Sequence, residues 1–342
     1  MHHDPLSDVL RSVRLRGAVF YYTSYRDEWV AETPAAVEIA GALMPGAEHL
    51  LEYHLMVKGE GWAATAGVSP VRLSAGDIVM FPRGDAHVLS SAPGMRAEKD
   101  RADWIFETRD DPKPIAVAYH EGVLLGGAPM PVDEARNIVV CGFVACDLKP
   151  FNPLIATLPR LLHLRSDAVG GWVRDVLHQA VIESRERRPG SAAVLERVSE
   201  MVFVDAARRH LESLPEEAEG WLAGLRDRHV GKALSAIHDE PARAWTVDDL
   251  GQEAGLSRSA LHERFVRFVG QPPMQYLASW RMQLAANLLR SSHANVATIA
   301  LDVGYDSEAA FTRAFKRATG RPPSAWRREH AGGARLKSPA AG

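Results

Sequence analysis

The sequence predicts a multidomain α+β chain with a β-rich N-terminal part, a helical middle segment and an all-α C-terminal domain. Short apolar segments recur roughly every ten residues in the first part, which is typical of successive strands. Amphipathic helical stripes follow, and a helical pattern is then duplicated near the C-terminus. The chain has 342 residues, of which 46% are hydrophobic and 24% charged. Such length and composition predict two or three globular domains and exclude fibrous and wholly disordered classes.

The first 165 residues are expected to form one β-rich domain. Its apolar segments include Gly17–Tyr22, Ala36–Leu43, Ile78–Phe81 and Ile138–Ala145, with turn residues between them. Since no helical stretch long enough for a crossover separates these segments, a sandwich or barrel is favoured over a parallel sheet.

Residues 166–225 are expected to form a helical linker. Their apolar stripes are Trp172, Val176, Leu177, Ala180 and Val181, followed by Val194, Val198, Met201, Val202 and Ala206. Such helices can close the core of the first domain or pair with a second copy. Because they lie between a β-domain and a separate helical domain, we favour a part in dimerisation and expect a homodimer.

Residues 226–330 contain an internal duplication. Leu250–Ser257 recurs as Ile299–Asp306, 49 residues later. Each copy reads as a short helix, a tight turn at Gly255 or Gly304, and a longer helix, which is the helix-turn-helix pattern. The last residues, 331–342, are expected to be a disordered tail.

The duplicated region is basic. The residues expected to contact phosphate are Arg264, Arg267, Arg281, Arg313, Lys316, Arg317 and Arg321. In helix-turn-helix proteins the second helix enters the major groove, and its first residues read base edges. Those positions are Arg258, Ser259 and His262 in the first copy and Ser307, Glu308 and Thr312 in the second. The pattern therefore predicts binding to double-stranded DNA, while a basic helical module that docks an acidic protein is the alternative.

Residues from about Arg226 to Arg328 resemble the DNA-binding domain of the AraC/XylS family of bacterial transcription regulators. The resemblance is strongest from Gly304 to Arg317 and continues through Gly320, Pro322-Pro323-Ser324 and Trp326-Arg327. It implies promoter binding through two helix-turn-helix units and activation of transcription by contact with RNA polymerase.

The stretch from Gly76 to His87 resembles the second sequence motif of cupins, and Glu52 to Gly61 resembles a degraded first motif. Together they imply that residues 1–165 form a cupin-like β-barrel that senses a signal. Its interior could hold a small-molecule effector, although no residue identifies that molecule. A metal-dependent cupin oxygenase or isomerase with a DNA-binding appendage is the alternative, against which the missing motif histidines count.

Four side chains in this domain could bind a metal: His54, His87, Cys141 and Cys146. Two imidazoles and two thiolates would make a closed tetrahedral zinc site. In a regular strand the two cysteines would face opposite ways, so a bulge at Gly142 would be needed to align them. A redox role for the cysteines and a simple core role for all four residues are the alternatives.

The net charge of −3 conceals two halves of opposite sign. Residues 231–342 carry 15 Lys and Arg against 10 Asp and Glu, whereas the whole chain carries 40 against 43. The N-terminal part is thus acidic, and DNA binding is expected to fall to the basic helices. With two cysteines, no signal peptide and no apolar run long enough to span a membrane, a cytoplasmic location is expected.

Overall fold

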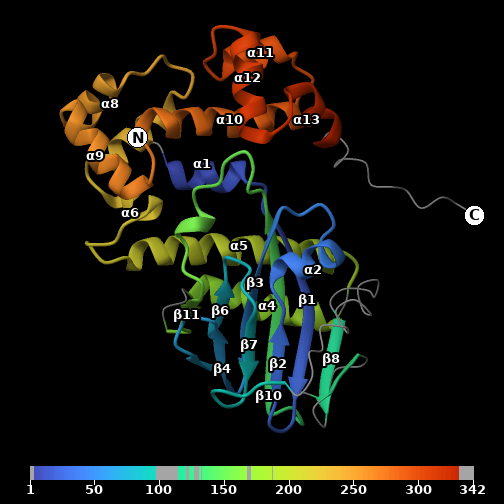
Figure 1. Cartoon of the computed structure of the whole chain (residues 1–342). Coiled ribbons are helices and arrows are strands. Elements are labelled where there is room, and N and C mark those ends of the chain that lie inside the picture. The colour runs from blue at the N-terminus through green and yellow to red at the C-terminus, as the bar shows by residue number, and fades with distance from the viewer. Residues whose placement is uncertain are drawn as a thin grey trace, which may run out of the picture. The chain divides into compact units, whose positions relative to one another are not determined.

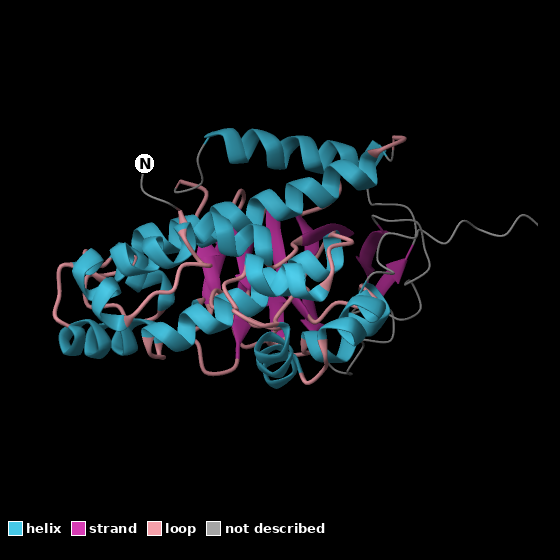
Figure 2. Ribbon diagram, turned by 90° about the horizontal axis from the view of Figure 1, so that it is seen from above, coloured by secondary structure: helices cyan, strands magenta, loops and turns pink. Residues whose placement is uncertain are grey.

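The computed structural model describes residues 4–97, 115–120, 123–126, 131, 133–167, 171–186 and 188–330. The expected tail at 331–342 lies outside these residues. The chain divides into two compact units (Figure 1). One unit comprises Arg14–Asp147 and Leu158–Ser213, and the other comprises Met1–Val13, Leu148–Thr157 and Leu214–Gly342. All the described strands, magenta in Figure 2, belong to the first of these units, which we call the barrel unit.

The barrel unit contains two sheets. Their strand orders are β11-β6-β3-β10-β1-β8-β9 and β2-β7-β4-β5. The strands are β1 (Arg16–Tyr25), β2 (Val30–Thr33), β3 (His49–Lys58), β4 (Glu60–Thr65), β5 (Val71–Ser74), β6 (Ile78–Phe81), β7 (His87–Ser90), β8 (Ile115–His120), β9 (Val123–Gly126), β10 (Asn137–Cys146) and β11 (Leu162–Leu164). β1 and β8 pair in parallel, and β3 and β10 pair antiparallel. The β-rich N-terminal region expected from the sequence is therefore confirmed.

Both sheets contribute side chains to one apolar core. Phe81 of β6, Leu89 of β7 and Phe143 of β10 belong to the same buried cluster. Every residue of β10 is buried, as expected for a strand that is covered on both faces. One face of β10 supplies this core, and the other is covered by a helix of the same unit.

Two segments differ from the sequence-based expectation. Residues expected to form a strand form the helix α2 (Ala36–Leu43), in which Ile39 and Leu43 are buried one turn apart. Ala, Glu and Leu favour helix over strand, and this preference outweighs the apolar character of the run. β11 follows the short 3₁₀ helix η1 (Ile155–Thr157), although Leu154, Leu158, Leu161 and Leu162 are spaced as one face of a helix.

Two helices, α4 (Gly171–Glu186) and α5 (Ser191–Ser213), complete the barrel unit. α5 packs against β1 and β10. The approach is close at Gly17, where a Cβ atom would lie 2.3 Å from the carbonyl oxygen of Glu196. The hydroxyl of Tyr53 on β3 also reaches α5, where it lies 2.8 Å from Ser199 Oγ. α5 is therefore seated on the sheet by both packing and a buried hydrogen bond.

The second unit is helical. Its helices are α1 (Pro5–Ser12), α6 (Trp221–Arg226), α7 (Val230–Asp239), α8 (Val247–Ala254), α9 (Arg258–Val269), α10 (Pro273–Ser291), α11 (Val296–Asp302), α12 (Glu308–Thr319) and α13 (Pro323–His330). The buried amide of Gln283 on α10 donates to the Ser12 carbonyl at 2.9 Å and accepts from the Phe151 N–H at 3.1 Å. Residues 4–13 and 148–157, which the sequence-based bounds assign to the first domain, thus pack with the C-terminal helices.

Candidate functional site

The first helix-turn-helix unit consists of α8 and α9. α8 begins with a capping box, in which the Thr246 hydroxyl accepts from the Asp249 N–H at 3.1 Å and the Asp249 carboxylate accepts from the Thr246 N–H at 2.9 Å. It ends at Gly255, whose φ of +68° is a conformation that side chains with a Cβ rarely adopt. Ser257 then caps α9 by accepting from the Ala260 N–H.

The second helix-turn-helix unit, which consists of α11 and α12, repeats this arrangement. Asn295 caps α11 by accepting from the Thr298 N–H at 2.7 Å, and Ser307 caps α12 by accepting from the Ala310 N–H at 3.3 Å. Gly304 turns the chain between them at a φ of +82°. The two units therefore share the same local architecture, and the 19-residue helix α10 connects them.

The residues expected to read bases begin the second helix of each unit. Arg258, Ser259 and His262 are exposed on the first turns of α9. Among the described residues, Arg258 forms only a long ion pair, 3.6 Å, with Asp248. Both side chains are more than 60% exposed, so solvent and salt weaken this pair. A guanidinium in that setting is available to a partner.

On α12 the expected base-reading residues differ in availability. Glu308 is exposed and Thr312 is half-buried, so both lie at the surface of the first turns. Ser307 is the N-cap, and its hydroxyl is already engaged with the Ala310 N–H. Thr312 and Glu308 are therefore better placed than Ser307 to contact a base.

Six of the seven basic residues expected to contact phosphate fall into two groups. Arg313, Lys316 and Arg317 are exposed on α12, and no ion pair joins them to another described residue. The arginines of the other group are paired: Arg264 with Asp227, Arg267 with Glu219, and Arg321 with Glu329. Phosphate contacts from this second group would have to compete with an internal carboxylate.

Arg281 corrects one sequence-based expectation. Its Nε donates to the Pro241 carbonyl at 2.7 Å, its Nη1 to the Gly304 carbonyl at 3.0 Å and its Nη2 to the Arg243 carbonyl at 2.8 Å. Burial lowers the pKa of this guanidinium. Arg281 therefore stabilises the turn between α11 and α12, and the expectation that it contacts phosphate does not fit its position.

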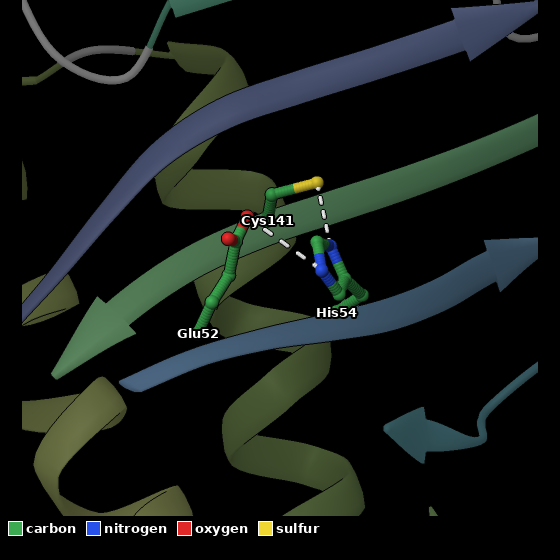
Figure 3. A group of neighbouring side chains, drawn as sticks. All are labelled: Glu52, His54 and Cys141. Carbon is green, nitrogen blue, oxygen red and sulfur yellow. Dashed lines mark hydrogen bonds and ion pairs between the residues drawn. The ribbon is translucent and has the colours of Figure 1, made fainter. Parts of the chain in front are cut away.

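A different kind of site lies inside the barrel unit, where acidic, imidazole and thiol groups meet. Glu52 and His54 project from β3 and Cys141 from β10 (Figure 3). Residues two apart on a strand share a face, and Cys141 lies directly opposite His54 in the β3–β10 register. His87 approaches from β7 of the other sheet, with its ring stacked on Phe81 at 3.7 Å between centroids.

The contacts within this cluster are short. His54 Nδ1 lies 3.0 Å from Cys141 Sγ, and His54 Nε2 lies 2.8 Å from His87 Nε2. The Glu52 carboxylate lies 3.6 Å from His54 Nε2 and 3.5 Å from His87 Nε2. Glu52, His54 and His87 are each less than 10% exposed, so these groups interact in a region of low polarity.

Burial sets the charge state of the cluster. It raises the pKa of the Glu52 carboxyl well above its usual range and lowers the pKa of His87 to about 4. Burial, together with the neighbouring His87, also lowers the pKa of His54, while burial and the nearby Glu52 raise the pKa of the Cys141 thiol. Burial thus disfavours the charged form of each of the four groups.

The expected four-ligand set of His54, His87, Cys141 and Cys146 is not assembled. Cys146 lies opposite His49 in the β3–β10 register, and the pairing is regular from Cys141 to Cys146. An odd separation along a regular strand places the two cysteines on opposite faces. The irregularity near Gly142 lies in β1, between Val19 and Tyr21, so it does not turn Cys146 inward.

The sequence reasoning missed Glu52. The signal was its place two residues before His54, since a strand through both residues directs them to one face. Nothing in the sequence indicated that this face would be the interior for an acidic residue, because glutamate is seldom buried without a partner.

Comparisons with known proteins match the N-terminal and C-terminal parts of the chain to two different families. A family model described as a cupin matches residues 4–212, and one described as a helix-turn-helix domain matches residues 250–329. An AraC-like transcription regulator of Streptomyces lividans is 31% identical over 327 residues, which cover 95% of this chain and 98% of that protein. The chain belongs to the AraC family of transcription regulators.

Other relatives of this AraC family member extend the comparison. The HTH-type transcriptional regulator AlkR of Acinetobacter baylyi is 26% identical over 95% of this chain and 99% of its own length. A solved structure of the DNA-binding domain of AdpA in complex with a target DNA is 26% identical and covers 30% of this chain and 93% of that domain, with a TM-score of 0.29.

The full-length relatives are regulators, and the AraC family member described here is a DNA-binding transcription regulator rather than the cupin enzyme considered as an alternative. Among its described residues, no helix combines the length and the apolar character needed to cross a membrane.

Proposed function

We propose that this chain is a homodimeric cytoplasmic activator that binds promoter DNA through α9 and α12 and responds to a signal received by its barrel unit. α9 and α12 would enter successive major grooves, about 34 Å apart. Their exposed first turns would face base edges, while the basic side chains of α12 would neutralise phosphates.

The observation that carries this proposal is the surface of α12. Arg313, Lys316 and Arg317 are exposed, and within the described part of the chain no carboxylate pairs with them. Three uncompensated cations on one helix repel one another unless an anionic partner neutralises them. A phosphate backbone supplies that charge at closely spaced positions.

Base recognition would rest on residues with suitable donors and acceptors. Arg258 can donate two hydrogen bonds to guanine, and Glu308 can accept from the amino group of cytosine. Ser259, His262 and Thr312 offer single polar contacts. Ser307 would contribute chiefly by capping α12, since its hydroxyl already accepts from the Ala310 N–H.

The test begins with a genome-wide footprint of the full-length protein, which provides its own site. Binding to that site is then measured over a range of salt concentrations. Arg258→Ala should weaken binding by about 5- to 150-fold, which corresponds to the roughly 1–3 kcal/mol carried by a bidentate base contact, and should relax specificity at one position. Arg313→Ala should weaken binding to all sequences and reduce the salt slope by about 0.9.

A matched control is Arg72→Ala, which removes an exposed arginine of the barrel unit that pairs with Glu60. This variant should bind DNA as the wild type does. If Arg258→Ala and Arg313→Ala also bound like the wild type with an unchanged salt slope, the DNA-contact assignments would be wrong.

Dimerisation is supported by the exposed face of α5. Val194 and Met201 are 45% and 41% exposed and lie seven residues apart, so they share one side of the helix. A second copy of the chain would cover this apolar stripe. Sedimentation of the full chain should show a dimer that Met201→Glu dissociates, and an unchanged oligomeric state would refute this face.

Activation through RNA polymerase is supported by membership of the AraC family. A promoter reporter in a deletion strain tests it, since an activator loses transcription on deletion whereas a repressor gains it.

A further inference from the structure

The segment between α5 and α6, residues 214–219, is acidic. It contains Glu216, Glu217 and Glu219 and no basic residue. It belongs to the second compact unit, which we call the helical unit, and it follows α5 directly in the chain. Carboxylates repel the phosphate backbone, so an acidic segment in a unit that binds DNA needs an explanation.

α6 connects this segment to α9, the helix expected to read bases in the first helix-turn-helix unit. The two helices pack against each other. Just after α6, the Asp227 carboxylate accepts from Arg264 Nε at 3.0 Å. Just before α6, the Glu219 carboxylate accepts from Arg267 Nε at 2.9 Å. An ion pair therefore joins α9 to the chain at each end of α6.

The two ion pairs differ in exposure. The Asp227 side chain is 7% exposed, and it also accepts from the His229 and Val230 N–H groups at the start of α7. Its pair with Arg264 is therefore part of the fold. Glu219 and Arg267 are 60% and 55% exposed, so their pair is weak and open to exchange with another anion.

Arg267 lies close to the base-reading side of α9. It is eight residues after Ser259, and at about 100° per residue the two side chains are about 80° apart around the helix axis. The buried side chains of α9 are Leu261, Phe265 and Phe268. At the same spacing, each of them is more than a quarter of a turn from Arg267. A guanidinium beside the base-reading side is placed to meet the phosphates that line the major groove.

We propose that Glu219 is an autoinhibitory phosphate mimic. Its carboxylate occupies Arg267 in the free protein and must be displaced before Arg267 can contact the DNA backbone. This inference rests on the proposed binding of DNA by α9. Movement of residues 214–219 away from α9 would free Arg267 and strengthen DNA binding.

The expected effect is small but has a definite sign. An exposed ion pair is favoured over its open form by a factor of about 1.4 to 5. DNA binding has to open this pair, so removing the carboxylate should raise the affinity by that factor plus one, which is about 2- to 6-fold. If Glu219 only supported the position of α9, its loss would weaken DNA binding instead.

The experiment measures binding of the full-length protein to the DNA site found by footprinting. Glu219→Gln should bind about 2- to 6-fold more tightly than the wild type. Arg267→Met, which removes the proposed phosphate contact, should weaken binding to all sequences and reduce the salt slope by about 0.9. In the Arg267→Met background, Glu219→Gln should lose its advantage.

The matched control is Glu217→Gln. It removes the same charge two residues earlier, from an exposed side chain for which no ion pair is seen within the described part of the chain. It should gain less affinity than Glu219→Gln, and its small gain should be the same with and without Arg267. Urea unfolding of each variant shows whether stability has changed.

Three results would overturn the inference: Glu219→Gln binds no more tightly than Glu217→Gln, binds more weakly than the wild type, or gains equally with and without Arg267. If Arg258→Ala still weakens binding in the same assay, the proposed function stands and only the role of Glu219 is wrong. If Arg258→Ala and Arg267→Met both bind like the wild type, the assignment of α9 to DNA is wrong as well.

Discussion

Replacing Arg281 by methionine tests whether this residue serves the fold or the DNA. The substitution keeps most of the aliphatic stem and removes the guanidinium. Three carbonyl groups then lose their donor: Pro241 and Arg243, between α7 and α8, and Gly304, at the turn between α11 and α12. These bonds link the segment before α8 to the turn before α12, so their loss should destabilise both helix-turn-helix units.

The magnitude follows from the exposure of these bonds. A hydrogen bond from a charged donor contributes about 1.5–3 kcal/mol when buried. Two of the three are part-buried and one is exposed, so water can replace part of what is lost. We expect Arg281→Met to lower the free energy of unfolding by about 2–4 kcal/mol, near the upper end of the range for single substitutions.

Urea unfolding followed by tryptophan fluorescence measures this change, because Trp280 lies next to Arg281 on α10. DNA binding should weaken with an unchanged salt slope, since no phosphate contact is removed. Arg313→Met is the matched comparison and should show the reverse, with a lower salt slope and unchanged stability. An Arg281→Met protein of wild-type stability with a salt slope lower by about 0.9 would refute the structural role.

Two further predictions concern stability. Burial alone would raise the pKa of Asp227, but Arg264 and two backbone N–H groups outweigh it and lower the pKa. Asp227→Asn should therefore lower the free energy of unfolding by about 1–2 kcal/mol at neutral pH. This difference from the wild type should become smaller as pH falls through the lowered pKa of Asp227, because the wild-type carboxylate is then protonated. Urea titrations at several pH values measure it. A pH-independent difference would contradict this. Gly142→Ala should cost about 1–3 kcal/mol by overpacking, because its Cβ would lie 2.4 Å from the Tyr53 ring. Thermal unfolding measures it, and a background of Tyr53→Leu should relieve it.

The paired helix-turn-helix architecture of the helical unit could be predicted from the sequence, for a local reason. Its signals are a capping residue, a turn glycine and apolar positions one helical turn apart, and all lie within a window of about 20 residues. Thr246, Gly255 and Ser257 occupy the positions those rules assign. A duplicated pattern supplies the same evidence twice, so the pairs of helices needed no tertiary information.

Whether an arginine contacts another group of the chain could not be predicted, because the contacting group lies far along the sequence. Arg264 pairs with Asp227, 37 residues earlier, and Arg281 reaches carbonyls up to 40 residues away. Sequence periodicity places such residues on a helix surface without showing what packs over that surface. The same reason applies to Glu52, whose neighbour His87 belongs to the other sheet.

Cys146 illustrates a prediction that depended on one local irregularity. Cys141 and Cys146 are an odd number of residues apart, so a regular strand directs them to opposite faces. Only a bulge in β10 would direct both side chains to the same face. The extra residue is in β1, and β10 remains regular over this stretch. Which of two paired strands carries a bulge is decided by the packing of both, and the sequence of one strand does not reveal it.

The alternation of β3 also links the barrel interior to α5. Tyr53 stands between Glu52 and His54 but points the other way, and its hydroxyl meets Ser199. Glu52 and His54 therefore flank a residue whose side chain contacts α5 directly, without an intervening loop. α5 ends at Ser213, where the chain leaves the barrel unit. The interior residues of β3 and the end of α5 at Ser213 are therefore connected through one peptide unit, one hydrogen bond and one helix.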